Sequence, residues 1–224
     1  MNTKVAASLK AAFNTFAKEE NVNGEQGLKS LEKLFSADYD FMTKVDKLDE
    51  IFDNEPDLDS LREITFDLLL INFFSEDAQK LDEDYLESAQ WEAIEEETID
   101  RGTELLNLLL YLKECEDEEI EPSLDDYLKE FLLVEEDEFQ DEHRIYEDII
   151  ANQILMESGL EEIAKVSKNL SEESDMKELF YPVMAFFLEP NPDKETVTKF
   201  MNLSEDAPFD GAILDLLVSY NNAR

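Results

Sequence analysis

The sequence has few of the residues that build disulfide frameworks, metal centres, hairpins and long loops. It holds one cysteine, one histidine, five glycines and six prolines in 224 residues. The single cysteine, Cys115, excludes an intrachain disulfide and is typical of a protein from a reducing compartment. Because glycine and proline are scarce, few positions suit tight turns or long irregular loops. This composition favours a mostly helical protein with short connections.

Motifs that bind metals or phosphates are also missing. The one histidine, His143, cannot supply a zinc site built on a histidine pair, nor the two Glu-x-x-His motifs of a di-iron bundle. The stretch Glu19–Gly24 resembles the start of a calcium loop, but Ser30 stands where the loop needs a bidentate glutamate. No glycine-rich phosphate loop occurs. We therefore predict no bound metal and no cofactor.

The chain offers little for nucleophilic catalysis. Cys115 and His143 could form a nucleophile–base pair, but Cys115 lies within the acidic run Glu114–Glu119. Neighbouring anions disfavour the thiolate, which is the reactive form of cysteine. We therefore predict that the protein is not an enzyme. A metal-dependent enzyme that uses clustered carboxylates is the weakest of the three functional hypotheses considered for this chain.

Long apolar runs are absent as well. The richest run, Leu105–Leu112, is much shorter than the about 20 residues that span a bilayer. The start of the chain, Met1–Phe16, is interrupted by Lys10 and lacks the apolar centre of a signal peptide. We expect a cytoplasmic protein that does not contact membranes.

Acidic residues, by contrast, are abundant. The chain carries 58 Asp and Glu against 19 Lys and Arg, a formal net charge of -39. Residues 56–150 alone hold 33 acidic and 6 basic side chains, whereas residues 1–20 are almost neutral. So much charge of one sign destabilises the folded state through self-repulsion. Because the acidic residues are concentrated in one stretch, we expect them to form a binding surface, rather than to serve general solubility or adaptation to salt. The basic stripe of a direct nucleic-acid binder is missing.

The fold class follows from the spacing of apolar residues. They recur every three or four residues almost throughout, and strict alternation is rare, which predicts an all-α, irregular multi-helix bundle. Intervals of 30 to 36 residues between Leu28, Leu58, Trp91, Leu124 and Leu160 leave stacked αα-hairpins, as in a solenoid, as an alternative. We expect residues 1–224 to form one domain, with a subdivision near 150–158 as the alternative.

The first functional hypothesis is a binding or inhibitor protein whose acidic face engages a basic protein such as a nuclease or toxin. Acidic residues three or four apart on a helix recur every ~4.5–6 Å, near the one phosphate per ~3.4 Å along each DNA strand. Two more specific forms of this hypothesis are mimicry of nucleic acid and neutralisation of a toxin, as by an immunity protein. The predicted partner-binding residues are Glu116, Asp117, Glu118, Glu119, Glu121, Asp125, Asp126, Glu135, Glu136, Asp137, Glu138, Asp141 and Glu142.

The alternative hypothesis is a helical scaffold or adaptor protein. Residues 179–188 are apolar on all sides of a helix, which indicates either a buried central helix or an exposed contact surface. If the segment is exposed, Phe180, Phe186 and Phe187 would anchor a partner or a homodimer. In that case the acidic residues would serve mainly to keep the protein soluble.

Overall fold

The computed structural model describes residues 1–77, 88–132 and 144–223, with only the backbone for Asp77, Gln90, Glu130, Phe131 and Leu132. These residues form twelve α-helices, and no strand occurs among them. The all-α prediction is confirmed. Its physical basis is the apolar stripe on each helix, which can be buried only against another helix.

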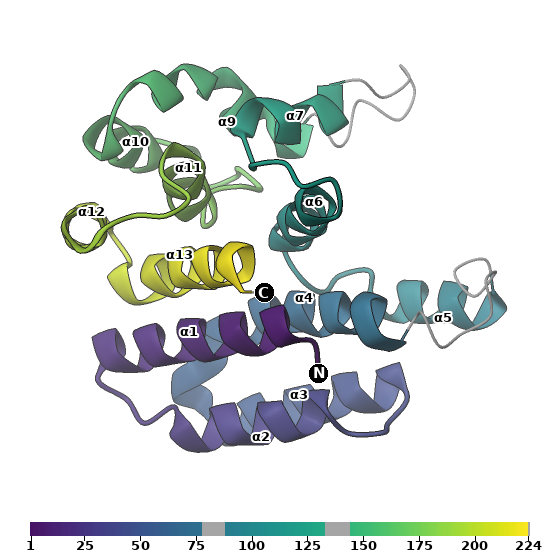
Figure 1. Cartoon of the computed structure of the whole chain (residues 1–224). Coiled ribbons are helices and arrows are strands. Elements are labelled where there is room, and N and C mark those ends of the chain that lie inside the picture. Colours follow the sequence, from purple (N-terminus) through teal and green to yellow (C-terminus); the bar gives the residue numbers. More distant parts are fainter. Residues whose placement is uncertain (78–87, 133–143, 224) are drawn as a thin grey trace.

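The N-terminal helices form the lower part of the molecule in Figure 1. They are α1 (Thr3–Glu20), α2 (Glu25–Phe35), α3 (Phe41–Asn54), the 3₁₀ turn η1 (Pro56–Leu61) and α4 (Arg62–Asn72). A π-helical turn, η2 (Phe73–Asp77), continues α4. The apolar stripe of α1 is buried in full and comprises Val5, Leu9, Ala12, Phe13 and Phe16. Pro56 stands at the start of η1, where its fixed φ suits the first turn of a helix.

The middle of the chain contributes α5 (Ala89–Thr98), α6 (Leu105–Asp117), α7 (Leu124–Leu132), α9 (Glu147–Ala151) and the 3₁₀ turn η5 (Gln153–Glu157). Helix α7 starts with a capping box formed by Ser123 and Asp126. The Asp126 amide donates to Ser123 Oγ at 3.2 Å, and that hydroxyl donates to the Asp126 carboxylate at 2.9 Å. Leu124 and Leu128 are buried, as expected for the inner side of this helix.

The C-terminal helices are α10 (Leu160–Ser167), α11 (Phe180–Leu188), α12 (Lys194–Leu203) and α13 (Ala207–Asn222). Helix α13 returns to lie antiparallel along α1 (Figure 1). Lys4 Nζ is 5.5 Å from the Tyr220 ring centre near one end of this pair, and the Thr15 hydroxyl donates to Asp215 further along it. The repeats of a solenoid contact only their neighbours, so this pairing of the first and last helices does not support the solenoid alternative.

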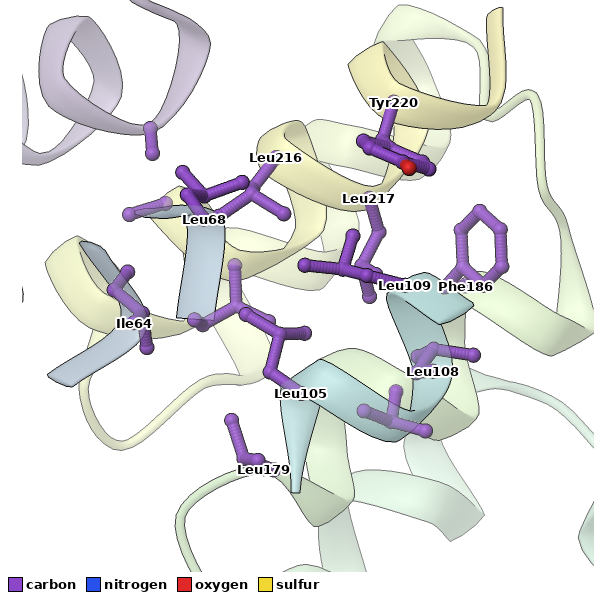
Figure 2. Packing of buried hydrophobic residues seen from close by; sticks show 14 of the residues in the cluster. Ile64, Leu68, Leu105, Leu108, Leu109, Leu179, Phe186, Leu216, Leu217 and Tyr220 are labelled. Carbon is purple, nitrogen blue, oxygen red and sulfur yellow. The ribbon is translucent and has the colours of Figure 1, made fainter. Parts of the chain in front are cut away.

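Four helices meet at the centre of the core, which Figure 2 shows from close by. Leu68 of α4, Leu109 of α6, Phe186 of α11 and Leu217 of α13 are each 0–1% exposed. Residues 179–187 are all buried and Leu188 is half-buried, so α11 is the central helix that its composition indicated. The alternative of an exposed contact surface or homodimer at 179–188 is wrong, because Phe180, Phe186 and Phe187 fill the core.

In the described parts of the chain, no helix combines the length and the apolar character needed to cross a membrane. The positions 133–143, which include six of the predicted partner-binding residues and His143, lie outside the described residues.

Candidate interaction surface

Seven of the predicted partner-binding residues gather where α6 ends and α7 begins. We call them the acidic turn: Glu116, Asp117, Glu118, Glu119, Glu121, Asp125 and Asp126. Six of them are exposed and Asp126 is half-buried, because Cys115, Leu124 and Tyr127 take the inward positions. The remaining predicted residues, Glu135, Glu136, Asp137, Glu138, Asp141 and Glu142, lie outside the described residues.

Backbone and side-chain hydrogen bonds hold the acidic turn against the core. The Ile120 amide donates to the Cys115 carbonyl at 2.9 Å, which closes the C-terminal end of α6. The Tyr111 hydroxyl accepts from the Ser123 amide at 3.0 Å and donates to the Ser123 carbonyl at 3.1 Å. Since Tyr111 is itself buried, these bonds fix the start of α7 relative to α6. The carboxylates are thus presented on a defined backbone.

Three lysines offset part of this charge. Lys4 Nζ lies 2.9 Å from Glu116, Lys113 lies 3.4 Å from Asp117, and Lys129 contacts both Asp125 and Asp126. Hydrogen bonds from Lys129 and Ser123 lower the pKa of Asp126. Among the described residues, Glu118, Glu119 and Glu121 have no ion-pair partner. The surface therefore keeps a net negative charge centred on the turn itself.

The backbone conformation at Glu119, in the acidic turn, is unfavourable for glutamate. Glu119 has φ of 58°, the left-handed region that normally costs a residue with a Cβ atom about 1–2 kcal/mol. The only other non-glycine residue with positive φ in the described chain is Asn21, whose short polar side chain tolerates this conformation. The last turn of α6 also lacks a basic residue, although cations are favoured at a helix C-terminus.

A second acidic helix was not among the predicted sites. Glu92, Glu95, Glu96 and Glu97 are exposed on α5, and no ion pair to them occurs within the described residues. Trp91 Nε1 donates to Glu95 at 2.5 Å. The signal available in the sequence was the glutamate run between the apolar positions 91, 94 and 99, with no basic residue in it.

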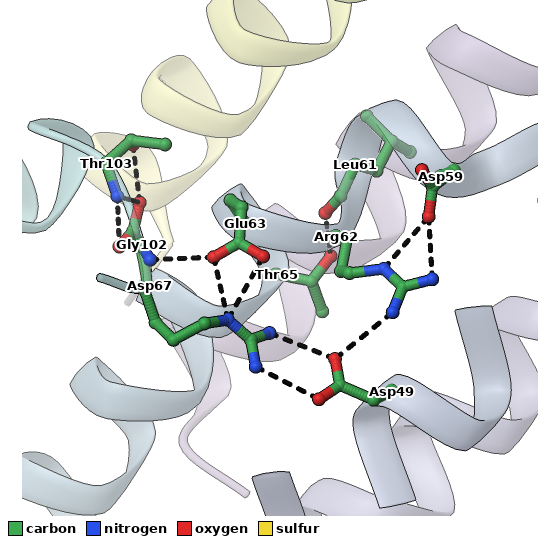
Figure 3. Close-up of polar contacts among 10 residues, drawn as sticks. Asp49, Asp59, Leu61, Arg62, Glu63, Thr65, Asp67, Gly102 and Thr103 are labelled. Carbon is green, nitrogen blue, oxygen red and sulfur yellow. Dashed lines mark hydrogen bonds and ion pairs between the residues drawn. The ribbon is translucent and has the colours of Figure 1, made fainter. Parts of the chain in front are cut away.

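A network of hydrogen bonds and ion pairs connects the N-terminal helices to the segment before α6 (Figure 3). The Arg101 guanidinium donates to both Asp49 oxygens at 3.0 Å, and its Nε donates to Glu63 at 3.0–3.1 Å. It also lies 4.9 Å from the Phe66 ring centre. The Gly102 amide donates to Glu63 at 2.7 Å. Through these contacts the network joins α3, α4 and the segment before α6.

At Thr103, the same segment contacts the buried carboxyl group of Asp67. The Thr103 amide and hydroxyl donate to Asp67 at 3.0 Å and 2.6 Å, and the Asp67 side chain has no exposed surface. Burial raises the pKa of Asp67 to about 7, although the two Thr103 hydrogen bonds act in the opposite direction. Sequence reasoning missed Asp67; its position inside an apolar run of α4 was the available signal.

Cys115 does not have the environment of a catalytic thiol. It is 3% exposed, and burial raises the pKa of its thiol, so the unreactive protonated form dominates. Over the described ranges, no three His, Cys, Asp or Glu side chains are grouped so that they could hold a metal ion.

Comparison with known proteins adds no family or relative to these observations. A scan against protein-family models and searches of curated proteins and of solved structures find no match. The function must therefore be inferred from the surface chemistry described above.

Proposed function

We propose that the acidic turn is a docking site for a strongly basic protein surface, and that the protein acts by binding rather than by catalysis. The observation that carries this proposal is Glu119. Its carboxylate is exposed and makes no hydrogen bond or ion pair among the described residues, yet it occupies a left-handed backbone position. Strain of this kind persists where another requirement outweighs it. The left-handed position itself closes α6 through the Ile120–Cys115 hydrogen bond, and the use of glutamate there in place of glycine or asparagine directs a negative charge at the partner.

The neighbouring residues support the same inference. Glu118 and Glu121 flank Glu119, are exposed and lack an ion-pair partner within the described chain. Like charges placed this close repel one another, and a partner that brings lysine or arginine relieves the repulsion. Association with such a partner is expected to be fast and to weaken steeply with salt.

The finer form of the proposal is that the partner normally binds nucleic acid. Acidic side chains on adjoining helix ends offer carboxylates at intervals near those of DNA phosphates. A nuclease or toxin with a phosphate-binding surface would then be blocked when the acidic turn occupies that surface.

The test begins with capture of partners from an extract of the native host at low salt, followed by salt elution and identification. The affinity of each captured partner is then measured for a triple variant, Glu118→Gln, Glu119→Gln and Glu121→Gln. We expect this variant to bind at least about tenfold more weakly, since each lost charged contact is worth about 1.5–3 kcal/mol. Competition by short duplex DNA tests the mimicry version.

The matched control removes the same charge elsewhere. Glu157→Gln, Glu173→Gln and Asp175→Asn also neutralise three exposed carboxylates that have no ion pair among the described residues. If both triple variants lose affinity equally, the overall charge attracts the partner and the acidic turn is not a specific site. Unchanged binding of the first variant would contradict the proposal outright.

A further inference from the structure

A hollow of about 380 Å³ lies among the C-terminal helices, away from the acidic turn. Its walls come from α10 and the residue after it, from Glu172, Lys177 and Glu178, from Tyr181 of α11, and from the end of α12 to the first turn of α13. Ser60 reaches it from η1. These helices lie together on one side of the molecule in Figure 1. The volume is within the range of about 300–1,000 Å³ that small-ligand sites occupy.

The hollow is lined by one buried carboxylate, Asp210, which is only 8% exposed. Its Oδ2 accepts a hydrogen bond from Ser204 Oγ at 2.5 Å, while no described residue donates to its Oδ1. Among the described residues, Ser8 Oγ is the only fully buried side-chain polar atom without a hydrogen-bond partner. Asp210 Oδ1 is not such an atom, so it keeps some access to solvent, and because Asp210 lines the hollow this oxygen can accept a hydrogen bond from a ligand there.

One of the two lysines in this lining, Lys177, is already engaged. Lys177 Nζ donates to the carbonyls of Ser167 and Leu170 at 3.3 Å and 3.1 Å and lies 3.3 Å from Glu172. These contacts fix the segment after α10 and offset the charge of Lys177. Lys177 therefore stabilises the local structure and does not form an anion-binding site.

The remaining charge of the lining is negative. Glu178, Glu205 and Asp206 are exposed and line the hollow beside the buried Asp210, and only Lys168 opposes these four charges. Burial raises the pKa of Asp210 to about 7, and the nearby Asp206 and Glu205 act in the same direction. A cation placed against Asp210 would relieve both the repulsion and the buried charge.

We propose that this hollow binds an alkylammonium group, with the ammonium against the Asp210 carboxylate and the aliphatic chain along Phe209 and Leu203. Both of these apolar residues line the hollow and are half-buried. The ring of Phe209 also attracts a cation that is held near its face. The group can belong to a free amine or to a lysine side chain of another protein. The site does not depend on the function proposed for the acidic turn.

Isothermal titration calorimetry of the full-length protein with n-butylammonium chloride tests the proposal at pH 7. Because burial raises the Asp210 pKa to about 7, the empty site is partly protonated near this pH, and a bound cation displaces that proton. Titrations in two buffers of different ionisation enthalpy measure this release. A parallel titration with Nα-acetyl-lysine methylamide distinguishes the sources: tighter binding of this compound points to a protein lysine, and weaker binding points to a free amine.

Three variants provide the controls. Asp210→Asn keeps an oxygen for the Ser204 hydroxyl, and we expect at least about tenfold weaker binding and no proton release. Phe209→Leu keeps apolar volume but removes the ring, and about threefold weaker binding is expected. Asp175→Asn removes an exposed charge that does not line the hollow and should change neither quantity. Equal loss in Asp175→Asn and Asp210→Asn, binding without proton release, or preferential binding of inorganic phosphate would each overturn the proposal.

Discussion

Replacing Asp67 with asparagine is expected to stabilise the protein, and increasingly so as the pH rises. Asp67 is a carboxyl group with no exposed surface, and its pKa is raised from 3.8 to about 7. In the unfolded chain this group ionises near its ordinary pKa. Folding is therefore opposed by an increasing amount as the pH rises from about 4 to about 7, and the opposition is constant above that.

The magnitude follows from the size of the shift. A difference of one pKa unit corresponds to about 1.36 kcal/mol, so the shift from 3.8 to about 7 amounts to about 4 kcal/mol at pH 8. At pH 5 only about 2 kcal/mol of this opposition has developed, since the pH is then about one unit above the unfolded pKa. The stabilisation by Asp67→Asn should therefore grow by about 2–3 kcal/mol between pH 5 and pH 8. Asparagine retains an oxygen that can accept from the Thr103 amide.

Urea unfolding at pH 5, 6, 7 and 8 measures this difference at constant ionic strength. The pH range stays above the sequence pI of about 4.1, and the fluorescence of the single, buried Trp91 reports unfolding alongside circular dichroism. Asp46→Asn removes the same charge from an exposed position on the neighbouring helix α3 and corrects for the general relief of repulsion. If the two variants show the same pH dependence, Asp67 does not carry a raised pKa and the reasoning is refuted.

Three further predictions concern the backbone, the polar network and the overall charge. Gly102→Ala should lower the free energy of unfolding by about 2 kcal/mol or more, because φ is +83° there and a Cβ atom would lie 2.4 Å from Asp67 Oδ1; full stability in chemical denaturation would contradict this. Glu119→Gly should raise the free energy of unfolding by about 0.5–1 kcal/mol by relieving the left-handed backbone, whereas the matched Asn21→Gly should change it by only a few tenths; equal effects would remove the argument for strain at Glu119. The melting temperature should rise with added sodium chloride, since salt screens charges over a Debye length of ~8 Å; a flat response would mean that the carboxylates are already compensated.

Local patterns determined the fold class because helix formation and burial depend on neighbours in the chain. The stripe from Val5 to Phe16 and the capping pair Ser123 and Asp126 could be read from spacing alone, and both occur in the structure. The exposure of Glu116–Glu119 follows from the same logic, since Leu112 and Cys115 take the inner side of α6. A helix that is apolar on all sides, α11, is buried for the complementary reason.

The pairing of distant elements could not be predicted, because it depends on contacts between residues far apart in the sequence. Nothing local in α1 indicates that α13 lies against it, nor that Arg101 reaches Asp49 on α3. The raised pKa values of Asp67 and Asp210 likewise depend on the burial that the assembled helices create around them. Composition and periodicity thus determined an acidic, all-helical protein, while only the tertiary structure decided which carboxylates face solvent freely and which are enclosed, since dielectric environment is a property of packing rather than of sequence order.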